Sequence, residues 1–185
     1  MFSVLALGEF IEEEGIETSL GAFSELYHAV TSKHQKQMEM QMIIKGLKTD
    51  DIKQQLKNYK IEDKVELINW DNQQQVELSY ENAAVMLLPT KDNLTKIISE
   101  SFSFGLPVIC FENFFNKEII DPTCGMMVTA DSVGENIIEF SNRLRILYFD
   151  PEAQKILKRG AKNKYKNAFS WGNEDPKASK ELVNS

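Results

Sequence analysis

Six short apolar runs, each bounded by turn or polar residues, place the strongest constraint on how this chain can fold. Segments between several of these runs carry apolar residues at helical spacing, as at Leu20, Phe23, Tyr27 and Val30. Strands that are buried on both faces read as continuous apolar runs rather than alternating ones. The pattern therefore predicts an α/β fold with a Rossmann-like, doubly wound parallel sheet of about six strands and helices on both faces. The predicted strands are SVLALG (3–8), MQMII (40–44), VELIN (65–69), AVMLLP (84–89), PVICF (107–111) and GMMVT (125–129).

Length and composition indicate one globular domain. The chain has 185 residues, of which 42% are hydrophobic, and domains commonly hold roughly 100 to 200 residues. We expect a domain over residues 1–171, with its last helix at 151–168. A polar tail, or alternatively a truncated helix, follows over 172–185.

Charge and hydropathy exclude two classes of partner. The formal net charge of -7 argues against nucleic acid, because binding phosphate backbones needs clustered Lys and Arg. No apolar run approaches the ~20 residues that a membrane span needs, and the N-terminus lacks the pattern of a signal peptide. We therefore expect a cytoplasmic protein.

The loop and helix after the fourth predicted strand are where a fold of this class binds its ligands. The strand ends at Pro89, and the next helix is predicted to start near Thr95 and to stop before Gly105, a good C-terminal cap. Backbone N–H groups at residues 95–97 would lack intrahelical partners. This helix start therefore suits a negative group such as a diphosphate.

Two carboxylates eight positions apart, Asp92 in the loop and Glu100 in the helix, are the candidate ligand-binding side chains. Ionised carboxylates accept several hydrogen bonds and can orient a polyol. On composition alone, the same pair reads as an acidic helix start and a solvated helix face. The glutamate run at 12–14 reads as a solvated loop with no metal or general-base role, and His28 and His34 read as surface histidines.

The string DNLTKIISESFSFGLPVI (92–109) resembles the loop and helix of retaining glycosyltransferases with the GT-B fold, glycosyltransferase family 4 in particular. The stretch VLALGEFIEEEGIETSLGAFSEL (4–26) is similar to the first strand, glycine loop and helix of that family's C-terminal domain. MIIKG, DKVELINW, SYENAAVMLLPT, CGMMVTADS and NAFSW then follow in the family's order. The resemblance covers about residues 2 to 171.

The resemblance implies a domain that binds a nucleoside-diphosphate sugar as donor substrate, with no metal and no cofactor. In that family, the residue that matches Glu100 accepts hydrogen bonds from the ribose. The residue that matches Asp92 contacts the sugar hydroxyls, which makes Asp92 the catalytic candidate, and the helix start between them meets the diphosphate. The implied donor-binding residues are Gly8, Asp92, Asn93, Leu94, Thr95, Lys96, Ile97 and Glu100.

The sequence departs from the family at two positions after the first predicted strand. Glu9 and Glu14 stand where the family has an Arg and a Lys that hold the diphosphate. Like charges at close range repel, so we expect weak binding of nucleoside diphosphates. Lys96 is the candidate for a compensating charge.

The resemblance also implies a missing partner, because GT-B active sites lie between two such domains. We expect the chain to be the donor half of an enzyme of polysaccharide or glycoconjugate biosynthesis, inactive without its N-terminal acceptor domain. Any peripheral association with a membrane would run through that missing domain. The alternative is a non-catalytic subunit or remnant that serves as a binding or assembly module, which Glu9 and Glu14 favour.

Overall fold

A six-stranded parallel sheet forms the centre of the molecule. The computed structural model describes residues 1–8, 13–44, 49–129 and 131–169. The sheet has the order β3-β2-β1-β4-β5-β6, and all neighbouring strands run parallel. This arrangement confirms the predicted doubly wound sheet. The strands are β1 (Phe2–Leu7), β2 (Met38–Ile44), β3 (Val65–Asn69), β4 (Val85–Leu88), β5 (Val108–Phe111) and β6 (Gly125–Val128).

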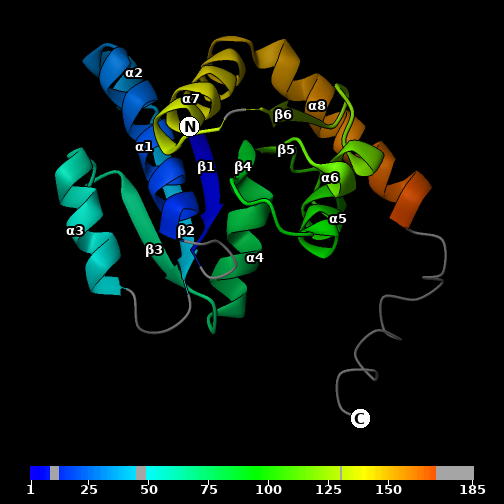
Figure 1. The fold of residues 1–185 in the computed structure, drawn as a ribbon, viewed down its shortest axis with the longest axis horizontal. Helices are drawn as coiled ribbons and strands as arrows, with labels where there is room; N and C mark the ends of the chain where they lie inside the picture. Colours follow the sequence, from blue (N-terminus) through cyan, green and yellow to red (C-terminus); the bar gives the residue numbers. More distant parts are fainter. Residues whose placement is uncertain (9–12, 45–48, 130, 170–185) are drawn as a thin grey trace.

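Helices connect the strands and cover both faces of the sheet. Figure 1 shows α3 beside β3 at one side of the molecule and α8 beside β6 at the other. The helices are α1 (Glu13–Ala29), α2 (Ser32–Gln35), α3 (Thr49–Tyr59), α4 (Gln73–Asn82), α5 (Thr95–Ser103), α6 (Phe114–Ile119), α7 (Val133–Phe149) and α8 (Pro151–Lys164), and a π-helical turn, η1 (Tyr165–Phe169), ends the described chain.

Successive side chains of each strand enter two separate hydrophobic cores. In β1, Val4 and Ala6 pack with residues of α1, α3 and α7, whereas Leu5 and Leu7 pack with residues of α4 and α5. Both sets are fully or almost fully buried. Burial on both faces explains why the strands read as continuous apolar runs.

Proline and charge account for the places where the predicted bounds differ from the observed ones. Proline cannot donate to a sheet, so β4 ends before Pro89 and β5 begins after Pro107. The helix predicted over 151–168 is α8 followed by the π-helical turn. The prediction of a solvated loop at 12–14 is wrong for residues 13 and 14, since α1 begins at Glu13, and the acidic side chain of Glu14 suits the helix dipole there. Glu12 and the tail 172–185 lie outside the described residues.

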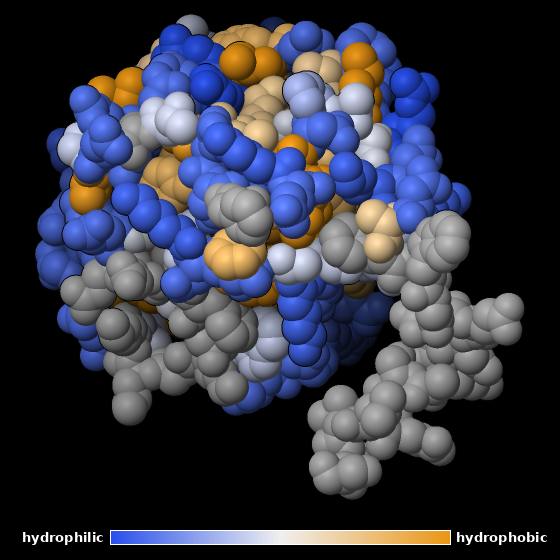
Figure 2. Space-filling view, turned by 45° about the vertical axis from the view of Figure 1, so that its right-hand side comes forward, coloured by the Kyte–Doolittle hydropathy of each residue, from blue (hydrophilic) through white to orange (hydrophobic). Residues whose placement is uncertain are grey.

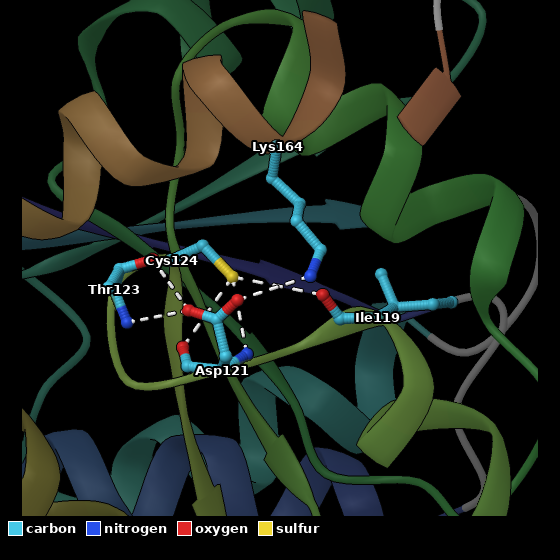
Figure 3. Close-up of polar contacts among 5 residues, drawn as sticks. All are labelled: Ile119, Asp121, Thr123, Cys124 and Lys164. Atoms are coloured by element: carbon cyan, nitrogen blue, oxygen red, sulfur yellow. Dashed lines mark hydrogen bonds and ion pairs between the residues drawn. The ribbon is translucent and has the colours of Figure 1, made fainter. Parts of the chain in front are cut away.

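The C-terminal part of α8 is tied to the turn that precedes β6. Lys164 Nζ lies 3.1 Å from Asp121 Oδ2, and Asp121 Oδ1 accepts hydrogen bonds from the backbone and the hydroxyl of Thr123 (Figure 3). The backbone N–H of Asp121 also donates to Cys124 Sγ at 3.4 Å. These contacts attach the last long helix to the edge strand of the sheet.

The surface is mainly hydrophilic. Figure 2 shows hydrophilic side chains over most of the face that is turned to the viewer, with hydrophobic ones in smaller areas between them. In the described part of the chain, no helix is both long and apolar enough to cross a membrane.

Candidate functional site

The carboxyl ends of the six strands lie at one edge of the sheet, since all strands are parallel. Strand order reverses between β1 and β4, and ligands of doubly wound folds bind outside such a reversal. The predicted loop between Pro89 and Thr95 leaves β4 at this edge and leads into α5. The sequence therefore predicted its place in the fold.

A cavity of about 440 Å³ opens at this edge. It is built from the first turns of α1, the loop after β4, the end of β5 and the start of α7. Its lining residues are Glu14, Gly15, Thr18, Pro89, Thr90, Lys91, Asp92, Phe111, Asp131, Ser132, Val133 and Asn136.

Asp92 enters this cavity from a loop that its own hydrogen bonds stabilise. The Thr90 hydroxyl donates to Asp92 Oδ2, and the Asp92 N–H donates to the same hydroxyl oxygen, both at 3.2 Å. Thr90 is almost fully buried, and its N–H donates to the Leu88 carbonyl at the end of β4. A buried threonine thus holds an exposed carboxylate at the mouth of the cavity.

The start of α5 differs from the prediction in its hydrogen bonding. The predicted free N–H of Thr95 in fact donates to Asn93 Oδ1 at 3.1 Å, and the Thr95 hydroxyl donates to the same oxygen at 2.6 Å. Leu94 is 8% exposed and packs in the core, so only its backbone can meet a ligand. Ile97 is partly buried against the same core. A second hollow, of about 510 Å³, is lined by Asn93, Thr95, Lys96 and Ser99.

Glu100 lies on α5, directly after Ser99 of this hollow. The residue is exposed as a whole, yet its surroundings desolvate the carboxyl group, and this burial raises the pKa of Glu100. The charge of Lys96, one helical turn away, acts in the opposite direction and lowers that pKa, but by less. A carboxylate with incomplete hydration gains from hydrogen-bond donors that a ligand brings.

Gly8 directly follows β1 at the same edge of the sheet. It is not one of the described residues that line the cavity or the second hollow. Its N–H donates to the Ile43 carbonyl at 2.7 Å, and a Cβ at this position would lie 3.0 Å from Ile44 Cγ2. The close approach of β2 explains the glycine. Glu9 lies outside the described residues, whereas Glu14 does line the cavity that contains Asp92.

The described lining of the cavity carries an excess of negative charge. Glu14, Asp92 and Asp131 contribute carboxylates, and Lys91 contributes an ammonium group. Among the described residues, no group of three or more His, Cys, Asp or Glu side chains is arranged to hold a metal ion. The cavity can therefore offer many hydrogen-bond acceptors but repels a polyanion.

Sequence reasoning missed the contribution of α7 to this cavity. Ser132 caps α7 by accepting from the Glu135 N–H at 3.3 Å, and its hydroxyl donates to the Glu135 carboxylate at 3.0 Å. A serine followed three residues later by a glutamate is the signature of a capping box. That signal, directly after the sixth apolar run, could have identified a second helix start at the site.

Residues 2–164 match the family described as glycosyl transferases group 1, and the chain belongs to that family. No curated protein matches the chain in sequence. The fold is that of one half of a GT-B glycosyltransferase, as solved structures show.

The pneumococcal O-GlcNAc transferase GtfA, in complex with UDP and GlcNAc, matches with a TM-score of 0.76 and 16% identity over 100% of this chain and 36% of that chain. Anabaena HepE, in complex with UDP and glucose, matches with a TM-score of 0.73 and 13% identity over 100% of this chain and 48% of that one. The C-terminal domain of a group 1 glycosyl transferase from Francisella tularensis matches with a TM-score of 0.69 and 13% identity over 91% of this chain and 86% of that domain's chain. The chain thus spans about a third to a half of the longer transferases.

Proposed function

We propose that this chain is the donor-binding half of a retaining glycosyltransferase that uses a nucleoside-diphosphate sugar. The observation that carries the proposal is the placement of Asp92 in a polar cavity, in the loop that leads into the helix of Glu100, at the strand reversal of a group 1 glycosyl transferase domain. Two structurally similar transferases bind UDP together with a sugar. UDP is therefore the natural first probe.

The proposed roles divide the ligand between three neighbouring groups. Glu100 accepts hydrogen bonds from the ribose hydroxyls, and the start of α5 at Lys96 and Ile97 meets the diphosphate through its N–H groups and the helix dipole. Asp92 accepts hydrogen bonds from the sugar and is the catalytic candidate. Thr90 supports this role by holding the loop that carries Asp92.

Completion of the active site requires a second domain on the carboxyl edge. The coverage of about a third to a half of longer transferases supports this proposal. The acceptor would bind in that second domain, and we propose a cytoplasmic role in polysaccharide or glycoconjugate synthesis.

A second candidate function, a non-catalytic binding or assembly module, is favoured by Glu14. This carboxylate lines the cavity at a position where the family resemblance implies a lysine. A chain that had lost donor turnover could retain the fold while losing that positive charge.

Isothermal titration of the chain with UDP tests the proposal. We expect binding near the millimolar range, and Glu100→Gln should weaken it by about 1 to 3 kcal/mol because a charge-assisted hydrogen bond is lost. Glu62→Gln, an exposed glutamate before β3 at the opposite edge of the sheet, is the matched control and should leave binding unchanged. Equal affinities for wild type and Glu100→Gln would exclude the assigned role of Glu100.

A further inference from the structure

Tyr80 on α4 carries a buried polar group that the fold does not use. The residue is 2% exposed, and among the described residues its hydroxyl has no hydrogen-bond partner. A buried hydroxyl without a partner loses its hydration and gains nothing in return. An unpartnered buried hydroxyl therefore calls for an explanation, and the residues around Tyr80 suggest a functional one.

The Tyr80 ring packs against Phe104, the residue that caps the C-terminal end of α5. The two ring centroids are 5.3 Å apart, and because Phe104 keeps helical dihedral angles and follows Glu100 by four residues, the two side chains project from the same side of α5 and its cap. Glu100 is therefore one turn nearer than Phe104 to the start of α5 at the carboxyl edge.

The helical position of Tyr80 predicts that its hydroxyl points toward the same edge. Long side chains in helices point back toward the helix N-terminus, and α4 begins at Gln73, shortly after β3 ends at Asn69. We therefore expect the hydroxyl on the Glu100 side of the Phe104 contact. Consistent with this, burial and then the charge of Glu100 both raise the pKa of Tyr80.

We infer that Tyr80 is a positioning residue for Glu100. When a nucleoside diphosphate occupies the site, the Tyr80 hydroxyl donates to one carboxylate oxygen of Glu100, and the other oxygen is left to accept from the ribose. Glu100 is exposed, and among the described residues no hydrogen bond or ion pair holds its carboxylate, so its side chain is free to change rotamer. The inference rests on the proposed function, since it assigns the ligand of Glu100 to a ribose.

Two tyrosines allow a matched test in the intact chain. Tyr80→Phe keeps the ring against Phe104 and removes only the unpartnered hydroxyl. Tyr148→Phe removes a hydroxyl that lies 2.7 Å from His34 Nδ1, beside Phe2 at the start of β1 and so at the opposite edge of the sheet. We expect Tyr80→Phe to bind UDP about tenfold more weakly with unchanged or higher stability to urea. Tyr148→Phe should lose stability and bind UDP as the wild type does.

A ligand without ribose hydroxyls separates positioning from a structural effect. The wild type and Tyr80→Phe should bind 2′,3′-dideoxyuridine diphosphate equally, because that ligand has no ribose hydroxyls to donate to Glu100. In a Glu100→Gln background, Tyr80→Phe should cause no further loss of UDP affinity. Equal loss of affinity for both ligands would show a structural role and overturn the inference.

The remaining outcomes distinguish this inference from the proposed function. If Glu100→Gln weakens UDP binding and Tyr80→Phe does not, the inference is wrong and the proposed function stands. If UDP, GDP and ADP all fail to bind the wild type at millimolar concentrations, the proposed function is wrong and the inference falls with it.

Discussion

Glu14 lies in the first turn of α1 and also lines the cavity that contains Asp92. A negative charge at a helix N-terminus is stabilising, because the N–H groups there carry a partial positive charge. The same negative charge opposes an anionic ligand in the cavity. The residue therefore favours the fold and disfavours a diphosphate.

Glu14→Lys should reverse both effects. We expect the affinity for UDP to rise by about threefold, since a repulsion becomes an attraction at a partly exposed site. We expect the free energy of unfolding to fall by about 0.5 kcal/mol, since a positive charge opposes the helix dipole. Calorimetric titration and urea unfolding measure the two quantities on the same preparation.

Glu25→Lys is the control for the change in total charge. Glu25 is exposed on the same helix, more than two turns from Glu14, and it does not line the cavity. An equal gain in UDP affinity for Glu25→Lys would attribute the effect to net charge and not to the position of Glu14.

At the scale of residues, the sequence predicts the exposed parts of the site better than the buried ones. Pro89 and Gly105 mark the ends of a loop and helix, and this places Asp92 and Glu100 without any knowledge of packing. The orphan hydroxyl of Tyr80 depends on how its ring packs against Phe104, the residue that caps α5. No local pattern in the sequence encodes that arrangement.

At the scale of elements, the attachment of α8 to the turn before β6 depends on a missing side chain. A Cβ at Gly160 would lie 1.8 Å from the Thr123 carbonyl oxygen, well inside any real contact. Gly134, near the start of α7, has no described atom within 4 Å of the same ideal position. The packing of α8 therefore requires a glycine at position 160, whereas the surroundings of Gly134 leave room for a side chain.

Gly160→Ala and Gly134→Ala should change stability in opposite directions. Alanine is the better helix former at both positions by up to about 1 kcal/mol. At Gly160 the clash should outweigh this gain and lower the free energy of unfolding by about 2 kcal/mol or more. At Gly134 only the gain remains. Urea unfolding of both variants checks the signs, and a stable Gly160→Ala protein would contradict the observed packing.

The Asp121 carboxylate at the same junction should make stability depend on pH. Hydrogen bonds from Thr123, with a smaller contribution from Lys164, lower the pKa of Asp121 from 3.8 to about 2. Because the pKa is depressed in the folded state, the stabilisation is present above the ordinary pKa and is lost as the pH falls toward about 2.

Asp121→Asn should therefore cost stability at neutral pH and little in acid. With allowance for solvent screening of a side chain that is 43% exposed, we expect a loss of about 1 kcal/mol at neutral pH that shrinks as the pH falls below about 4. Asp63→Asn changes an exposed carboxylate in the turn before β3, outside any helix, and should have no effect at either pH. Urea unfolding across this pH range makes the comparison, and a loss independent of pH would exclude the charge as its cause.

Element existence and order were predictable from the apolar runs, whereas contacts between elements were not. Each predicted strand overlaps an observed one, since burial on both faces leaves a continuous apolar signature. The contact of Gly160 with Thr123 joins two segments far apart in the chain, and the sequence carries no sign of it.

At the scale of the whole molecule, the fold brings like charges to one edge of the sheet. Glu14, Asp92 and Asp131 line the cavity together with Lys91. Lys96 lines the second hollow, and Glu100 lies with it on α5. Net charge of the chain could be counted from the sequence. Its concentration around the site could not, because α1, α7 and the loop after β4 meet there only once the sheet has formed.

This distribution predicts an unusual dependence of UDP binding on salt. Sites that hold phosphates by lysine and arginine bind more weakly as salt is added, since screening reduces attraction. Here the chain carries a net charge of -7, and the described residues around the site have more carboxylates than ammonium groups. Screening should therefore reduce a net repulsion. We expect the affinity for UDP to rise by about twofold between very low ionic strength and about 0.15 M.

Glu14→Lys provides the contrast for this prediction. That substitution changes the balance of charge at the cavity by two units without altering the sheet, so the rise in affinity with salt should become smaller or reverse. Titrations of both proteins with UDP in matched sodium chloride series measure the two slopes. A wild-type affinity that falls with salt would mean that Lys91, Lys96 and the start of α5 already outweigh the carboxylates, and that Glu14 lies outside the effective reach of the diphosphate.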